Sequence, residues 1–217
     1  MTGGIEAHPP VMTAVILGAH LIEVPGFVRL FRSLPGVDAY PQSIEDWAAD
    51  LAHVRDQYEV VIFYNINRTP PNDTVKAALE SLGETRQGIL MLHHGMLAFP
   101  EWQLWSDIVG IRNRSFTYHP GETVQVDIAD PDHPITRGLA PWTMVDETYI
   151  MDSAGEGSHI LLTTRHPKSL STLAWTRQYK NARVFCLASG HGTETYEDVN
   201  FQTVLTRGIH WLAHRIW

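Results

Sequence analysis

The sequence predicts an α/β fold in which a mostly parallel central sheet carries helices on both of its faces. Three times in the first half of the chain, a run of apolar residues is followed by a stretch with helical spacing. The apolar runs are continuous and do not alternate with polar residues, which is typical of parallel strands buried on both faces. The strand–helix alternation and the continuous runs therefore point to the same architecture.

The first half of the chain contains the three expected strands and most of the helix-terminating residues. Ser43 is a plausible N-cap, with Asp46 three residues later, and Gly83 and Gly110 follow two of the helical stretches. Asn72 or Asp73 caps the third helix, and Pro100 begins the fourth. The expected strands are 11–18, 58–65 and 88–94, and the expected helices are 23–34, 44–54, 70–83 and 99–110.

The second half is richer in strands. Five strand candidates separated by turns precede one long helical stretch near the end of the chain. They are 123–130, 143–151, 159–165, 171–179 and 182–189, followed by a helix over 200–216. With no repeat and no linker between the halves, we expect one domain over residues 11–217, preceded by a loose leader over residues 1–10.

Composition narrows the classes of partner and site. The 217 residues are 44% hydrophobic with a net charge of -8, and the basic residues do not cluster, which argues against nucleic acid as a partner. No apolar run approaches the roughly 20 residues that span a bilayer, and the start lacks signal-peptide features, so we expect a cytoplasmic protein without membrane contact. The single cysteine excludes a multi-cysteine zinc site. We expect a small-molecule partner. The sequence leaves open whether the chain forms a homo-oligomer.

Polar side chains follow the expected strands at one edge of the sheet, where open parallel sheets bind ligands. These residues are His20, Asn65, Arg68, His93, His94 and His191. The connections that hold Asp146, Glu147 and His119 can reach the same edge. A further histidine pair, His210 and His214, has the spacing of a zinc-binding helix but lacks its glutamate, which favours a packing role.

The order of several short motifs resembles ThuA-like domains, named for trehalose utilisation, within the class I glutamine amidotransferase-like superfamily. The matching stretches begin near residue 11 and continue to the end of the chain. They are "GAH" (18–20), "VVIFYN" (60–65), "GILMLHH" (88–94), "HPIT" (133–136), "DETY" (146–149), "LAW" (173–175) and "ARVFCLASGH" (182–191), followed by "NFQTVLTRGIHWLAH".

The resemblance implies a flavodoxin-like three-layer α/β/α fold. It also implies that the turn after "GILMLHH" corresponds to the nucleophile elbow, where the amidotransferases place a cysteine. This chain has His94 or its neighbour there, and Cys186 lies inside an expected strand, where burial keeps a thiol protonated. Glutamine hydrolysis through a thioester is therefore excluded, while His191 occupies a position like that of the amidotransferase histidine.

These residues support a protein that acts on or binds a carbohydrate, either a disaccharide or a keto-sugar derivative. We expect His94 and His191 to act as acid and base, with Glu147 as their partner. The expected substrate-binding residues are His20, Asn65, Arg68, His93, His119 and Asp146. No cofactor or metal ligand is assigned, because no short ligand spacing supports one. A divalent metal such as zinc on the same cluster, or a binding module without turnover, are the alternatives.

Overall fold

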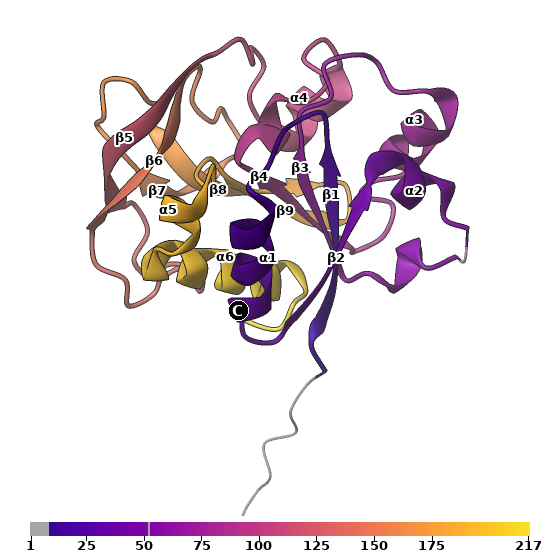
Figure 1. Ribbon diagram of the computed structural model, residues 1–217, viewed down its shortest axis with the longest axis horizontal. Helices are drawn as coiled ribbons and strands as arrows, with labels where there is room; N and C mark the ends of the chain where they lie inside the picture. Colours follow the sequence, from indigo (N-terminus) through magenta and orange to yellow (C-terminus); the bar gives the residue numbers. More distant parts are fainter. Residues whose placement is uncertain (1–8, 52) are drawn as a thin grey trace, which may run out of the picture.

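The computed structural model describes residues 9–51 and 53–217, and its strands form one nine-stranded sheet (Figure 1). The strand order is β2-β1-β3-β4-β9-β8-β7-β5-β6. Strands β2, β1, β3, β4 and β9 run parallel, and the remaining pairings are antiparallel. The predicted α/β class is confirmed. The leader expected over residues 1–10 falls almost entirely on residues 1–8, which lie outside the described residues.

The elements follow one another as strand–helix units first and as a mainly antiparallel ribbon later. The strands are β1 (Val11–Gly18), β2 (Val37–Ser43), β3 (Val60–Asn65), β4 (Gly88–Leu92), β5 (Thr117–Ile128), β6 (Trp142–Ile150), β7 (His159–Thr163), β8 (Thr172–Tyr179) and β9 (Ala182–Leu187). The helices are α1 (Val24–Ser33), α2 (Ile44–Ala49), α3 (Asp73–Glu80), α4 (Gln103–Val109), α5 (Thr193–Tyr196) and α6 (Val199–Leu212). Two short 3-10 helices are η1 (Arg55–Gln57) and η2 (His93–Leu97).

Strand β2 was not expected from the sequence. It pairs with β1 alone, at the edge of the sheet, and contains Pro41. An edge strand tolerates proline because one side of its backbone has no partner strand. The side chains of β2 are also only partly buried. The segment therefore lacks the apolar run by which the buried strands were predicted.

The predicted helix caps explain where several helices begin and end. The Ser43 hydroxyl accepts from the Asp46 amide and donates to its carboxylate, so the expected capping pair is confirmed. Helix α2 nevertheless ends at Ala49 and not at residue 54, because Asp50 takes a left-handed conformation. Asn72 caps α3, and Gly110, also left-handed, ends α4.

The helices cover both faces of the sheet and create two apolar cores. Helices α2, α3 and α4 pack on one face, where Phe63 meets Trp47 and Trp105 edge to face. Helices α1, α5 and α6 pack on the other, where Phe27 contacts Tyr64. All residues of β3 and β4 are buried, so their carboxyl ends are held rigidly where the predicted site lies.

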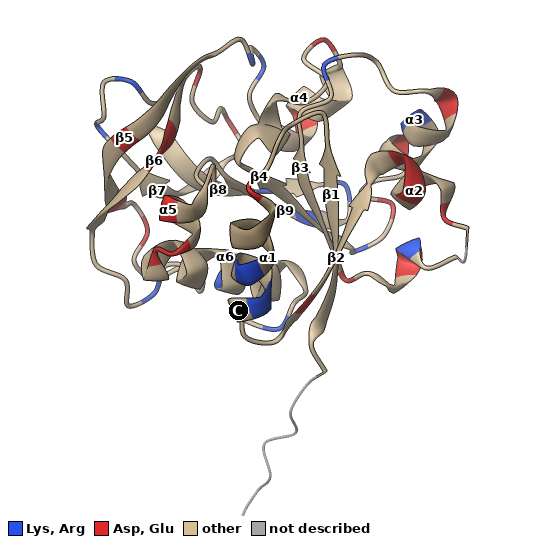
Figure 2. Cartoon of the chain, viewed as in Figure 1, with Lys and Arg blue, Asp and Glu red and all other residues tan. Residues whose placement is uncertain are grey.

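Charged side chains are spread over many elements and do not lie on one face alone (Figure 2). Acidic residues open α2 and basic residues lie on α1, and both signs occur in the loops. Within the described part of the chain, no helix is both long and apolar enough to cross a bilayer.

Candidate functional site

The chain leaves β4 through a strained turn at the predicted elbow. Leu92 is the last strand residue, and His93 takes a left-handed conformation with a φ of 49°. Such a conformation costs a non-glycine residue about 1–3 kcal/mol and persists only where its surroundings impose it. Gly95 shows how close those surroundings are, because a Cβ atom there would lie 2.0 Å from the Phe63 carbonyl oxygen. The turn therefore packs directly against the end of β3.

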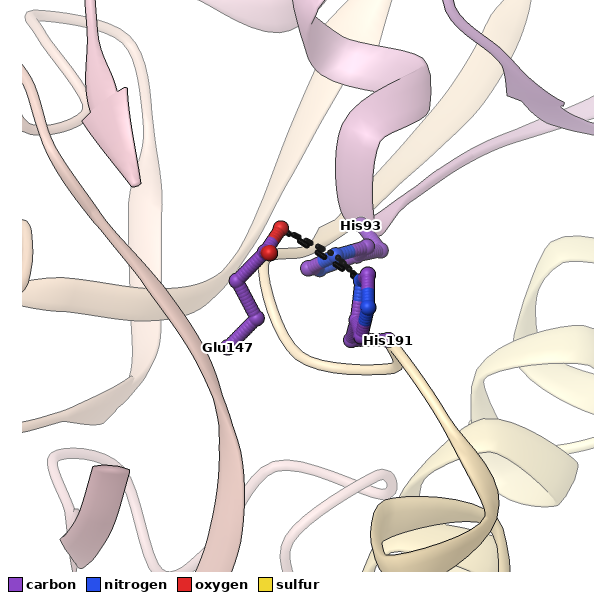
Figure 3. A group of neighbouring side chains, drawn as sticks. All are labelled: His93, Glu147 and His191. Atoms are coloured by element: carbon purple, nitrogen blue, oxygen red, sulfur yellow. Dashed lines mark hydrogen bonds and ion pairs between the residues drawn. The ribbon is translucent and has the colours of Figure 1, made fainter. Parts of the chain in front are cut away.

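Three predicted site residues meet at this edge of the sheet (Figure 3). His93 follows β4, Glu147 lies on β6, and His191 follows β9. His93 Nε2 and His191 Nδ1 are each 3.4 Å from Glu147 Oε1, and they are 3.3 Å from each other. His93 is fully buried and Glu147 nearly so, whereas 37% of the His191 side chain is exposed. His191 is thus the member through which a ligand reaches the group.

Hydrogen bonds fix the tautomers of both imidazoles. His93 Nδ1 lies 2.8 Å from the Ala188 carbonyl oxygen, which only accepts, so this nitrogen carries the proton. Nε2 of the neutral ring is then an acceptor, and it receives the Tyr149 hydroxyl at 2.6 Å. His191 Nδ1 lies 3.4 Å from Glu147 Oε1, a carboxylate oxygen that only accepts, and is therefore the donor. The lone pair of His191 is on Nε2.

The electrostatics of the group favour a carboxylate beside a neutral histidine. Burial raises the pKa of Glu147, but the neighbouring imidazoles of His93 and His191 outweigh it, and the pKa is lowered overall. Burial and the neighbouring His93 lower the pKa of His191, with Glu147 offsetting part of this. Burial and the Glu147 charge raise the pKa of Tyr149 well above its usual value. At neutral pH the group therefore holds the Glu147 carboxylate, a neutral His191 imidazole and a protonated Tyr149 phenol.

Asp146 supports the site from behind. Its carboxylate is buried and accepts from the Gly190 amide at 2.9 Å, the His191 amide at 3.0 Å and the Thr195 hydroxyl at 2.8 Å. Neighbouring residues of a strand face opposite ways, so Glu147 meets the histidines while Asp146 anchors the loop that carries one of them. The structure thus places the predicted acidic pair at the site, with two separate tasks.

Tyrosines complete the site, and the sequence reasoning did not single them out. Tyr149 follows Glu147 by two residues, a spacing that puts both on one face of β6. The Tyr64 hydroxyl lies 2.8 Å from both the Gly190 carbonyl oxygen and the Tyr196 hydroxyl, which supports the His191 loop. The spacing of two residues between Glu147 and Tyr149 in "DETY" predicts that both side chains lie on one face of the strand. The sequence around Tyr64 and Tyr196 gives no such indication, because both resemble ordinary core residues.

His94 and His20 lie beside the group and stack on each other. Their ring centroids are 4.1 Å apart, and His20 also meets the His191 ring edge to face at 5.8 Å. His94 Nε2 donates to the Tyr64 carbonyl at 3.0 Å, while its buried Nδ1 has no partner within the described chain. Burial, with His93 and His20 nearby, lowers the pKa of His94 to about 2. The structure therefore brings together His20, His93, His94, Glu147 and His191, with His93 and not His94 in contact with Glu147.

The other predicted residues lie around this centre or apart from it. Asn65 is buried and its Nδ2 donates to Asn67, while Arg68 donates to the carbonyl of Leu97, the last residue of η2. His119 lies directly opposite Thr148 across the β5–β6 pairing, on the face of β6 that Glu147 does not share. The structure does not bring His119 to the group.

Cys186 lies inside β9 and is completely buried. Burial raises the pKa of its thiol well above the usual range, so the thiolate needed for attack does not form at neutral pH. His210 lies outside this site, where its Nε2 donates to the Pro35 carbonyl at 2.9 Å, and His214 lies beyond the end of α6. Neither supplies a nucleophile or a ligand to the group.

Comparisons with known proteins identify the family and the fold of this chain. The family model described as trehalose utilisation, ThuA, matches residues 42–212. The chain belongs to the ThuA family. No functionally curated protein matches the sequence at a significant level.

Solved structures show the same fold. A ThuA-like protein from Parabacteroides merdae is 20% identical, with a TM-score of 0.74 over 94% of this chain and 90% of that one. A ThuA-like protein from Bacteroides uniformis is 19% identical, with a TM-score of 0.71 over 97% and 94%. A glutamine amidotransferase from Thermotoga maritima is 9% identical, with a TM-score of 0.55 over 94% and 98%. The fold is thus glutamine amidotransferase-like, as the resemblance implied.

Proposed function

We propose that this ThuA-family protein acts on a carbohydrate, a disaccharide or a keto-sugar derivative, by general acid–base chemistry at His93, Glu147 and His191. The observation that carries the proposal is the contact of Glu147 Oε1 with both imidazoles, at 3.4 Å each. The family description, trehalose utilisation, supports the substrate class. With no thiolate at the elbow, the chemistry rests on proton transfer and not on an acyl intermediate.

His191 is the base in this proposal. Its Nδ1 proton points at Glu147, and Nε2 makes no hydrogen bond within the described chain, so its lone pair is free to accept a proton from a sugar hydroxyl or from a carbon next to a keto group. Glu147 stabilises the imidazolium that forms, as a carboxylate does in a catalytic triad. The Tyr149 hydroxyl contacts His93 Nε2 and the Glu147 carboxylate. In this proposal it supplies a proton to the substrate after His191 has removed one.

The test is a screen of turnover on disaccharides and their keto and other oxidised derivatives, with a chelator present throughout. His191→Gln and Glu147→Gln are each expected to lower kcat by about 10²–10⁴-fold, the usual contribution of a positioned acid or base. Glu59→Gln is the matched control, because Glu59 precedes β3, at the end of the sheet opposite to the group, and pairs with Arg215. Full activity in both site variants, with the same folded stability, would show that the chemistry lies elsewhere.

A zinc-type site is the second candidate, and the geometry itself favours it. The three ligand atoms are 3.3, 3.4 and 3.4 Å apart. In a tetrahedron the ligand–ligand edge is about 1.6 times the metal–ligand bond, that is about 3.3–3.4 Å for zinc bonds of roughly 2.0–2.1 Å. The other ring nitrogen of His93, Nδ1, donates its proton to the Ala188 carbonyl, and metal-bound histidines typically make such a hydrogen bond.

Metal binding requires the Tyr149 hydroxyl to leave His93 Nε2 and the His191 proton to move from Nδ1 to Nε2, and the first requirement separates the two candidates. Zinc or cobalt is added to chelator-treated protein, and bound metal is measured by elemental analysis and by the visible spectrum of cobalt. If the site is a metal site, Tyr149→Phe binds at least as much metal as the native chain, and Glu147→Gln binds less. If the site works by proton transfer alone, no stoichiometric metal is found, and Tyr149→Phe loses activity.

A further inference from the structure

We propose that the cavity between the loop after β3 and the start of α4 is a binding site for a neutral sugar ring, separate from the His93–Glu147–His191 group. This inference rests on the carbohydrate function proposed above and extends it to a second subsite. The cavity has a volume of about 430 Å³, within the range of about 300–1,000 Å³ usual for small-molecule sites. Its principal lining residues are Arg68, Pro71, Asp73, Lys76, Glu101 and Trp102.

The wall of the cavity offers a flat apolar surface. Trp102 is half-buried, and its ring meets the buried Phe99 ring edge to face at 5.8 Å, while its amide donates to the Phe99 carbonyl at 3.0 Å. Arg114 holds the same loop, because its buried guanidinium donates to the carbonyls of Phe99 and Trp102. The indole is thus fixed in place before a ligand arrives, and a fixed aromatic face suits the C–H face of a pyranose.

The charged rim of the cavity matches a neutral polyhydroxylated ligand. Two cations, Arg68 and Lys76, face two anions, Asp73 and Glu101, so the rim has no net charge. Within the described chain Asp73 and Glu101 form no ion pair, and Lys76 reaches only Glu80, at 3.8 Å. A sugar hydroxyl donates to a carboxylate and accepts from a guanidinium or ammonium, so it uses both kinds of group. A charged ligand would meet two like charges as well as two opposite ones, so the rim gives it no net attraction.

The cavity lies next to the acid–base group but does not include it. The Arg68 guanidinium sits 5.5 Å from the centre of the Phe116 ring, and that ring meets Tyr149 edge to face at 5.5 Å. The Tyr149 hydroxyl in turn contacts His93 Nε2. One aromatic layer therefore separates the two places, which makes independent measurements of each feasible.

The test uses the full chain labelled with 5-fluorotryptophan and observed by ¹⁹F NMR. The sequence has seven tryptophans, and Trp102→Phe assigns the signal of interest. Trehalose, maltose and glucose are titrated in turn, with glucose 6-phosphate and glucosamine as charged analogues. We expect a saturable shift of the Trp102 signal with the neutral sugars, at least several-fold weaker binding of the charged analogues, and no comparable shift of exposed Trp217.

Variants separate this proposal from the acid–base function. The Trp102 shift is expected to persist in Glu147→Gln, while Trp102→Ala lowers trehalose affinity at least tenfold and the control Trp217→Ala leaves it unchanged. Sugar-dependent shifts of the His191 imidazole without any change at Trp102 would overturn the subsite and leave the proposed function standing. A Trp102 shift with neither turnover nor a sugar effect at His191 would overturn the proposed function and leave the subsite standing. No response at either position overturns both proposals.

Discussion

His94 is expected to make folding stability depend on pH, because the native state keeps this histidine neutral. Its ring is 1% exposed, its Nδ1 has no partner in the described chain, and burial with two histidines nearby lowers its pKa to about 2. In the unfolded chain the pKa returns to about 6.5. Below that pH the unfolded state binds a proton that the native state excludes, so stability falls as the pH falls.

The size of the effect follows from the two pKa values. One proton taken up only on unfolding changes the free energy of unfolding by about 1.4 kcal/mol per pH unit once the pH is well below 6.5. Between pH 7 and pH 5 this amounts to about 2 kcal/mol from His94 alone. The native state does not take up this proton in that range, because the pKa of His94 in the folded protein is about 2. This contribution is a sizeable part of the 5–15 kcal/mol typical of folded domains.

Urea denaturation at pH 5, 6, 7 and 8 measures the slope directly. His94→Gln keeps a side-chain N–H near the Tyr64 carbonyl but does not titrate, so its loss of stability from pH 7 to pH 5 should be smaller than the native loss by about 2 kcal/mol. His53→Gln is the control, because the side chain of His53 is 96% exposed. A His94→Gln variant with the native slope would show that His94 is protonated in the folded state and would refute this reasoning.

Three substitutions test the supports of the site by urea denaturation. Asp146→Asn exchanges an acceptor for a donor facing the Gly190 amide and should cost about 2–4 kcal/mol, whereas the exposed Asp152→Asn should change stability by less than about 0.5 kcal/mol. Arg114→Ala leaves several buried carbonyls of residues 96–102 without a donor and should cost about 3–5 kcal/mol, against little effect for exposed Arg112→Ala. Gly95→Ala places a Cβ atom 2.0 Å from the Phe63 oxygen and should cost at least about 3 kcal/mol, while Gly192→Ala, with open space around it, is tolerated. If Asp146→Asn, Arg114→Ala or Gly95→Ala is nearly as stable as the native chain, the contact described for that residue does not stabilise the fold.

The sequence carried enough information to predict the strands that are buried on both faces. Continuous apolar runs identified β1, β3, β4 and β9, because burial on both faces leaves no place for alternation. The edge strand β2 escaped prediction, since Pro41 and its polar neighbours are acceptable only where one side lacks a partner. Pairing order, which determines where each strand lies, depends on contacts between distant segments and not on local pattern.

The same limit explains what was predicted about the site. Placing polar residues at strand ends sufficed to identify His20, His93, His94 and His191 as neighbours, since parallel strands share one carboxyl edge. Strand alternation does not decide between His93 and His94, because it stops applying when the chain turns at His93 with a φ of 49°. His119 illustrates the reverse case, because only the β5–β6 register reveals that it faces away from Glu147.

The strained turn at His93 connects the fold to the proposed chemistry. A left-handed residue directly after a buried strand presents its side chain at the sheet edge, and in the related amidotransferases the resemblance places a thiol there. In this chain Gly95 packs on β3 and Arg114 holds the following loop, so the same turn presents an imidazole whose Nδ1 is held by Ala188. An imidazole held in that way accepts a proton or a metal ion at Nε2 and has no need of a covalent intermediate. At this turn the chain therefore offers an imidazole and no thiol, so under the proposals above it supports proton transfer or metal binding and not a thioester intermediate.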